Sequence, residues 1–183
     1  MFDRAYIEYL VHFHCDRDYF ECHEVLEEHW KKDALNNRKK YWVGLIQIAV
    51  ALYHQRRENF SGALKMISNA IKILEKEKDH IEQLGLHSEK LLKLLVNRKE
   101  DIQHQLAYTS INLPIINKNL MNECLLICRK EGMEWGLESN LSNPDLIHKH
   151  MRRNRSDVIK ERLVELEKRK KDRAVHTKKN PNL

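Results

Sequence analysis

Glycine and proline are scarce in this chain, with five Gly and three Pro among 183 residues. All-β folds need turn residues at nearly every strand end, so this scarcity argues against them. No apolar run reaches the roughly 20 residues of a membrane-spanning helix, because Gln47 interrupts the longest one, residues 42–53. The N-terminus shows no basic stretch followed by an apolar one, so nothing marks it for secretion. We therefore expect neither a membrane span nor a β-rich fold.

Cysteine is also sparse, and four in a chain this long do not indicate a disulfide framework. A reducing cytoplasm is the simplest setting. Cys124 and Cys128 alternate with apolar residues, and the chain has no Cys-x-x-Cys pair, so we expect both to be small buried core residues. Nothing in the sequence favours a redox pair between them and Cys15 or Cys22.

The excess of positive charge is confined to one end of the chain. The formal charge is +6, yet residues 1–128 hold 18 basic and 18 acidic groups, while residues 129–183 hold 15 basic and 9 acidic groups. The sequence thus predicts a neutral body with a basic C-terminal segment. Such a segment is typical of a solvated helix face, and binding of phosphate, RNA or an acidic partner is the alternative.

Apolar residues recur about every 3.6 positions along the whole chain, which predicts an all-α protein. We expect a compact helical bundle over residues 1–108, followed over residues 109–183 by a linker, a short helix and a long basic C-terminal helix that packs across the bundle, in one structural unit. Helix starts are expected at Asp3, Asp18, Ser88 and Asn143, which are capping residues. The small pair Gly62-Ala63 is expected to let two helices approach closely.

Polar residues border the apolar face of the predicted helix 18–32. His23 and Glu27 are four positions apart and share a face with Glu24 beside it. In the next predicted helix, residues 41–57, Gln47 and His54 share a stripe within an otherwise apolar stretch. A buried polar group without a hydrogen bond costs about 1–3 kcal/mol. We therefore expect both helices to bring these groups to one shared interface.

Three interpretations of this polar cluster remain open. It can be a hydrogen-bonded buried network that fixes helix register. It can be a site for zinc, iron or manganese, with His23, Glu27 and His54 as ligands and Glu24 as ligand or support. It can also be a ligand pocket or an acid–base site without metal. The stretch is not the H-E-x-x-H zinc motif, because Glu27 stands where that motif has its second His.

The ordered combination of Phe-Glu-Cys-His-Glu-Val-Leu-Glu (residues 20–27), Trp30, the stretch 44–54 and Gly62-Ala63 resembles domain-of-unknown-function family 309. This resemblance covers about residues 10–80 and implies a small all-helical protein of the bacterial or archaeal cytosol. It would place the family's polar positions at His23, Glu24, Glu27, Gln47 and His54. Residues 148–159 are similar to a C-terminal block of longer members. Cys22 and Glu58 depart from the pattern, where Ala and Gly are more usual, and the resemblance implies no reaction.

Basic residues cluster in the predicted C-terminal helix, at His148, His150, Arg152, Arg153 and Arg155. Arginine suits phosphate recognition, but the aromatic residues and module signatures of RNA-binding proteins are missing. The favoured hypothesis is a cytosolic, non-catalytic binding or scaffolding protein with a buried polar cluster, acting on a protein partner or as a homo-oligomer. The alternatives are a metal-dependent hydrolase or metal-binding protein at that cluster, and an RNA- or phosphate-binding protein.

Overall fold

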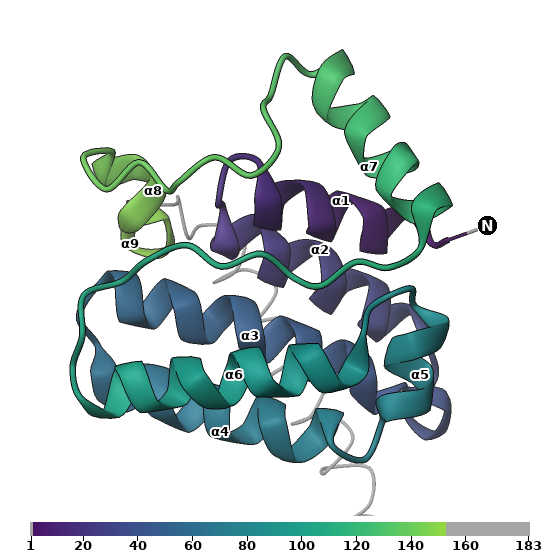
Figure 1. Cartoon of the computed structure of the whole chain (residues 1–183), viewed down its shortest axis with the longest axis horizontal. Coiled ribbons are helices and arrows are strands. Elements are labelled where there is room, and N and C mark those ends of the chain that lie inside the picture. Colours follow the sequence, from purple (N-terminus) through teal and green to yellow (C-terminus); the bar gives the residue numbers. More distant parts are fainter. Residues whose placement is uncertain (1, 153–183) are drawn as a thin grey trace, which may run out of the picture. The chain divides into compact units, whose positions relative to one another are not determined.

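The computed structural model describes residues 2–152. Within this range the protein is all-α, as the periodicity predicts, and no strand is present beyond an isolated bridge between Leu86 and Ile115 (Figure 1). The chain divides into two compact units, Met1–Lys149 and His150–Leu183. The structure therefore places residues 109–149 in the same unit as the preceding helices. No described helix is long and apolar enough to cross a membrane.

The first two helices begin at the predicted capping residues. Helix α1 (Arg4–His14) follows Asp3, whose carboxylate accepts a hydrogen bond from the amide of Ala5. Helix α2 (Tyr19–Lys32) follows Asp18, whose carboxylate accepts from the amide of Glu21 at 3.1 Å. Between them, Arg17 adopts the left-handed backbone region with a φ of 58°. This sharp corner turns α2 back against α1.

A central helix pair forms the next layer. Helix α3 (Lys40–Arg56) follows a short 3-10 turn (Leu35–Asn37) and packs against α2 and against α4 (Phe60–Leu74). The close approach of α3 and α4 depends on Gly44, because a Cβ there would lie 2.6 Å from Cδ2 of Leu74. The expectation for Gly62 is wrong: a Cβ at Gly62 would meet only the side chain of Asn59, the cap of its own helix.

The turn between α3 and α4 contains Glu58 at a φ of 58°, a conformation that glycine adopts most readily. The turn keeps this geometry although the chain carries Glu where the family resemblance leads us to expect Gly. Asn59 closes it, since its side-chain oxygen accepts from the amide of Gly62. The departure from the family pattern therefore leaves the turn intact.

Helices α5 (Lys78–Gln83) and α6 (Ser88–Gln103) complete the bundle. The break after Leu74 was not predicted, because the charged run that follows carries no Gly or Pro. Helix α6 begins at Ser88, but His87 is its N-cap residue. The amide of Ser88 donates instead to the carboxylate of Glu82 at 2.8 Å, so the expectation that Ser88 is the cap is wrong by one residue.

After α6 the chain returns across the bundle (Figure 1). We call residues 105–149 the strap. It starts with an extended stretch that includes Ser110–Ile116, as predicted, and continues into α7 (Lys118–Lys130), which packs against α1. Two short helices follow, α8 (Pro144–Ile147), capped by Asn143 as predicted, and α9 (Lys149–Arg152). The predicted continuation of a long helix to about residue 173 lies outside the described residues.

Candidate functional site

Helix α2 sets the position of the candidate site. Its buried face is formed by residues such as Cys22 and Leu26, both fully buried against α1 and α3. His23, Glu24 and Glu27 flank this face on one turn, as helical spacing requires. The three side chains are 29%, 33% and 34% exposed. We call them the α2 triad.

The ligand atoms of the α2 triad lie within 4.8 Å of one another. The two ring nitrogens of His23 face different carboxylates: Nδ1 lies 3.1 Å from Oε1 of Glu24, and Nε2 lies 3.6 Å from Oε2 of Glu27. Lys31 approaches from the next turn, with its Nζ 3.1 Å from the same Glu27 oxygen. The imidazole therefore lies between two anionic groups, with one cation at the edge.

The two polar residues of α3 are placed differently. His54 lies outside the group of ligand atoms formed by the α2 triad, and its Nδ1 accepts a hydrogen bond from the side-chain amide of Asn59 at 3.0 Å. Oε1 of Gln47 is buried without a hydrogen-bond partner among the described residues. All five residues of the predicted cluster are partly exposed. The expectation of a fully buried, fully hydrogen-bonded cluster is therefore wrong.

The predicted basic patch is only partly described. His148 is the C-cap of α8, His150 and Arg152 lie in α9, and Arg153 and Arg155 lie outside the described residues. Between His148 and His150, Lys149 binds two carboxylates at the start of α2. Its Nζ lies 2.5 Å from Oδ2 of Asp18 and 2.7 Å from Oε1 of Glu21. Burial lowers the pKa of Lys149, but these carboxylates outweigh it and raise the pKa overall.

The best-connected buried polar residue is one that the sequence did not single out. Arg17 is 1% exposed, and its guanidinium donates to four oxygens. All four acceptors are neutral, at 2.7–2.8 Å. One is the carbonyl of Phe13, and the other three lie in the strap: the carbonyls of Ile111 and Leu137 and the side chain of Asn112. A guanidinium can serve this many acceptors because it carries five donors.

Two further arginines hold the strap to α3 and α6. Arg56 donates to the carbonyls of Arg17 and Leu146 and to the hydroxyl of Ser139, and it lies over the ring of Tyr19 at 5.0 Å. Arg98 donates to Gln55 at 3.3 Å and to Thr109 at 3.1 Å. We call Arg17 and Arg56 the arginine clasp. Arg17 was not identified from the sequence, because Asp16-Arg17-Asp18 has the composition of an exposed turn.

His14 belongs to the same buried region. Its Nδ1 donates to the carbonyl of Leu10 at 2.8 Å, and its Nε2 accepts from the amide of Leu113 at 2.9 Å, so the ring is neutral. The indole of Trp135 stacks on it at 4.3 Å. The pKa of His14 is lowered to about 4, mainly by burial and also by the nearby charge of Arg17, and the hydrogen bonds to Leu10 and Leu113 offset only part of this.

The cysteines differ in part from expectation. Cys124 is buried with a free thiol, as predicted. Cys128 forms a disulfide with Cys15 across 113 residues, so the expectation that it is an unpaired core residue is wrong. The pairing depends on α7 packing against α1, a contact between distant parts of the chain that local sequence patterns do not reveal.

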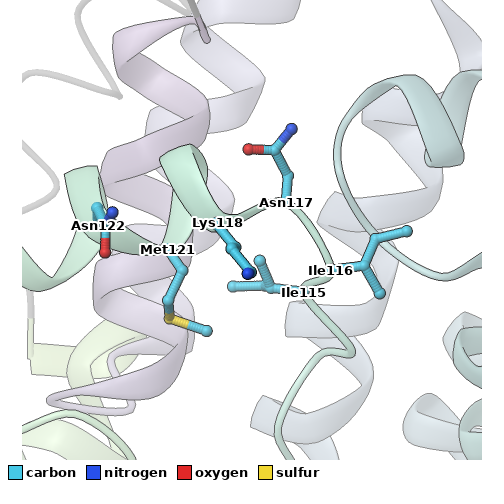
Figure 2. Close-up of a pocket in the computed structure, with 6 residues that line it drawn as sticks. All are labelled: Ile115, Ile116, Asn117, Lys118, Met121 and Asn122. Atoms are coloured by element: carbon cyan, nitrogen blue, oxygen red, sulfur yellow. The ribbon is translucent and has the colours of Figure 1, made fainter.

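A shallow cavity of about 260 Å³ lies where the extended stretch of the strap leads into α7 (Figure 2). None of its lining residues belongs to the α2 triad. They are mainly aliphatic and amide side chains with one cation, namely Ile115, Ile116, Asn117, Lys118, Met121 and Asn122.

Comparisons with known proteins agree with the resemblance. A family model described as "Domain of unknown function (DUF309)" matches residues 6–66, a range that includes the α2 triad, Gln47 and His54. The "Uncharacterized protein YpuF" of Bacillus subtilis (strain 168) is 53% identical over 173 residues, which cover 94% of this chain and 99% of that relative. No solved structure matches the chain. The chain therefore belongs to the DUF309 family.

Proposed function

We propose that this protein is a cytosolic metal-binding protein whose ligands are the α2 triad. The observation that carries the proposal is the gathering of an imidazole and two carboxylates, with ligand atoms within 4.8 Å, on one turn of a helix. Imidazole and carboxylate together suit zinc, iron and manganese as divalent ions. The proposal assigns binding and no reaction.

The surroundings of the triad support an open site. The side chains are about one-third exposed, so water can complete the coordination of an ion held by three protein ligands. The backbone beneath them is fixed, because α2 is capped by Asp18 and the face beside the triad is buried. Metal–ligand distances for these groups are near 2.0–2.2 Å, so the side chains must rotate to bring one ring nitrogen of His23 and both carboxylates to one ion.

The competing interpretation is an ion-paired network in which a protonated His23 is held by two carboxylates and Lys31 balances Glu27. Metal binding and this network make different demands on the imidazole, because a ligand nitrogen must be unprotonated. Metal affinity should therefore fall as the pH is lowered, because protons compete with the ion for the ligand nitrogen.

The test is elemental analysis of the untagged full chain, followed by calorimetric titration with Zn²⁺, Mn²⁺ and, without oxygen, Fe²⁺. We expect one ion per chain. Glu27→Gln should weaken binding by at least about tenfold, since loss of a ligand costs no less than loss of a supporting group around it. The matched control is Glu28→Gln, one position along α2, where the exposed carboxylate pairs with Lys32 alone among the described residues, at 3.6 Å. Absence of binding, or equal affinities of the two variants, would reject the proposal.

His54→Ala extends the same experiment. His54 lies outside the α2 triad in the structure, so the three-ligand proposal expects this variant to bind metal with unchanged affinity. A loss comparable to that of Glu27→Gln would replace the three-ligand site with one that spans α2 and α3.

A further inference from the structure

The disulfide lies at a junction of the fold. Cys15 is the C-cap of α1, with its amide bonded to the carbonyl of Val11, and it is 4% exposed. Cys128 lies in the last turn of α7 and is 2% exposed. The bond therefore connects the C-terminal end of α1 to the C-terminal end of α7, which is part of the strap.

The turn after α7, residues 131–137, depends on the residues beside the two sulfurs. On the Cys128 side, the amide of Met133 donates to the carbonyl of Cys128 at 2.8 Å. On the Cys15 side, the neighbouring His14 accepts the amide of Gly136 on its carbonyl at 2.8 Å and stacks on Trp135. The turn 131–137 is therefore bonded to Cys128 itself and to the residue that precedes Cys15.

The other two cysteines, Cys22 and Cys124, are free thiols. Cys22 is fully buried, and its thiol donates to the carbonyl of Tyr9 at 3.5 Å. Cys124 is also fully buried, one turn before Cys128 on α7. Burial raises the pKa of the Cys124 thiol to about 12, so it supplies almost no thiolate, the species that attacks a disulfide.

We propose that Cys15 and Cys128 form a reversible thiol–disulfide switch, which locks the turn 131–137 against α1 when oxidised and releases it when reduced. The inference rests on the cytosolic location in the proposed function and is independent of metal binding. Disulfides are rare in the reducing cytosol, and those found there are mostly catalytic or redox-sensing.

The reaction partner is a low-molecular-weight thiol and its disulfide. In oxidation, the thiolate of one cysteine attacks a sulfur of the small disulfide and expels one small thiolate, leaving a mixed disulfide on the protein. The thiolate of the other cysteine then attacks the protein sulfur and expels the second small thiolate. Two protein thiols and one small disulfide thus become one protein disulfide and two small thiols, and reduction is the reverse.

The first test is a redox titration of the full-length protein in mixtures of reduced and oxidised glutathione, with free thiols alkylated and counted by mass spectrometry. We expect the protein to change from four free thiols to two as the fraction of oxidised glutathione rises. A disulfide that survives millimolar reduced glutathione without any oxidised form would be a permanent structural bond. Four thiols that remain free in oxidised glutathione would equally overturn the proposal.

The second test measures the release of the turn by amide hydrogen exchange. The amides of Leu113 and Gly136 donate to the ring and the carbonyl of His14. We expect both to exchange at least about tenfold faster in the reduced protein, because local opening governs their exchange. The amide of Leu52, in the core of α3, serves as the reference and should not change. Equal exchange of the two reporter amides in both redox states would overturn the proposal.

Two variants separate the switch from general effects of thiol chemistry. Cys15→Ala should show fast exchange at the reporter amides in every glutathione mixture. Cys124→Ala, one turn away on the same helix, should keep the full redox response. If Cys15→Ala does not fold, the reduced wild-type protein still supplies the released state. None of these readouts requires metal, so failure here and failure of the metal proposal are separate results.

Discussion

At the scale of single residues, the neutral state of His14 links the structure to pH. The ring donates to Leu10 and accepts from Leu113, so a second ring proton would break the bond that joins α1 to the strap. The side chain is 1% exposed, and water cannot replace the lost partner without local opening. A protonated His14 is therefore incompatible with the closed structure.

The pH dependence of stability follows from this histidine. Its pKa is about 4 in the folded protein, against about 6.5 unfolded, so the unfolded state binds more protons between these values. The stabilisation is complete above about pH 6.5 and lost as the pH falls towards 4, a difference of about 3 kcal/mol. Urea unfolding between pH 7.5 and 4 measures it. His14→Gln, which cannot titrate, should lose less stability over the same range, and an identical loss would contradict the assignment.

At the scale of helices, local sequence predicted most of the elements. Asp3, Asp18 and Asn143 cap helices as expected, because a cap depends only on residues within one turn. The α2 triad was predicted for the same reason, since its members lie on one helix turn. Gln47 and His54 belong to another helix, and whether they meet the triad depends on how α2 and α3 cross, which no local pattern contains.

The packing of α3 on α4 gives a prediction at this scale. Gly44→Ala would place a Cβ 2.6–2.8 Å from atoms of Leu74, which is 1% exposed and has no room to move away. Overpacking of this kind costs about 1–3 kcal/mol, more than the gain in helix propensity. Urea unfolding measures the change.

Gly62→Ala is the matched control for Gly44→Ala. The three atoms nearest to its Cβ would all belong to the side chain of Asn59, at an exposed helix start. We expect the free energy of unfolding to change by less than about 1 kcal/mol. A double variant of Gly44→Ala with Leu74→Ala should cost less than the sum of the two changes, because removal of the Leu74 side chain makes room for the new methyl group. Additive costs would show that Gly44 is not the contact point.

At the scale of the whole molecule, the buried guanidinium groups of Arg17 and Arg56 connect the first helices of unit Met1–Lys149 to the strap. Arg17 binds three oxygens of the strap, and Arg56 binds the carbonyl of Arg17 as well as Ser139 and Leu146. Sequence patterns predicted the bundle but not this connection, because a buried arginine is recognisable only from acceptors about 100 residues away. The unexpected disulfide has the same origin, in the packing of α7 on α1.

Removal of the clasp should release the strap. Arg17→Met keeps a long apolar stem but leaves buried carbonyls without donors, so we expect a loss of about 3–5 kcal/mol in the free energy of unfolding. Arg4→Met is the control, because Arg4 is 89% exposed and, within residues 2–152, pairs with Glu8 alone. The control should change stability by less than about 0.5 kcal/mol. Both values come from urea unfolding at pH 7.5, and similar losses in the two variants would contradict the role of the clasp.

The clasp also sets an order of events during synthesis. A ribosome makes Arg17 early, but its acceptors at Ile111 and Leu137 emerge only after most of the bundle has been made. An unpaired guanidinium is too costly to bury, so it remains in water until then. The corner between α1 and α2 therefore reaches its final packing after translation has passed Leu137. A nascent chain that stops at residue 108 cannot pack this corner in its final form.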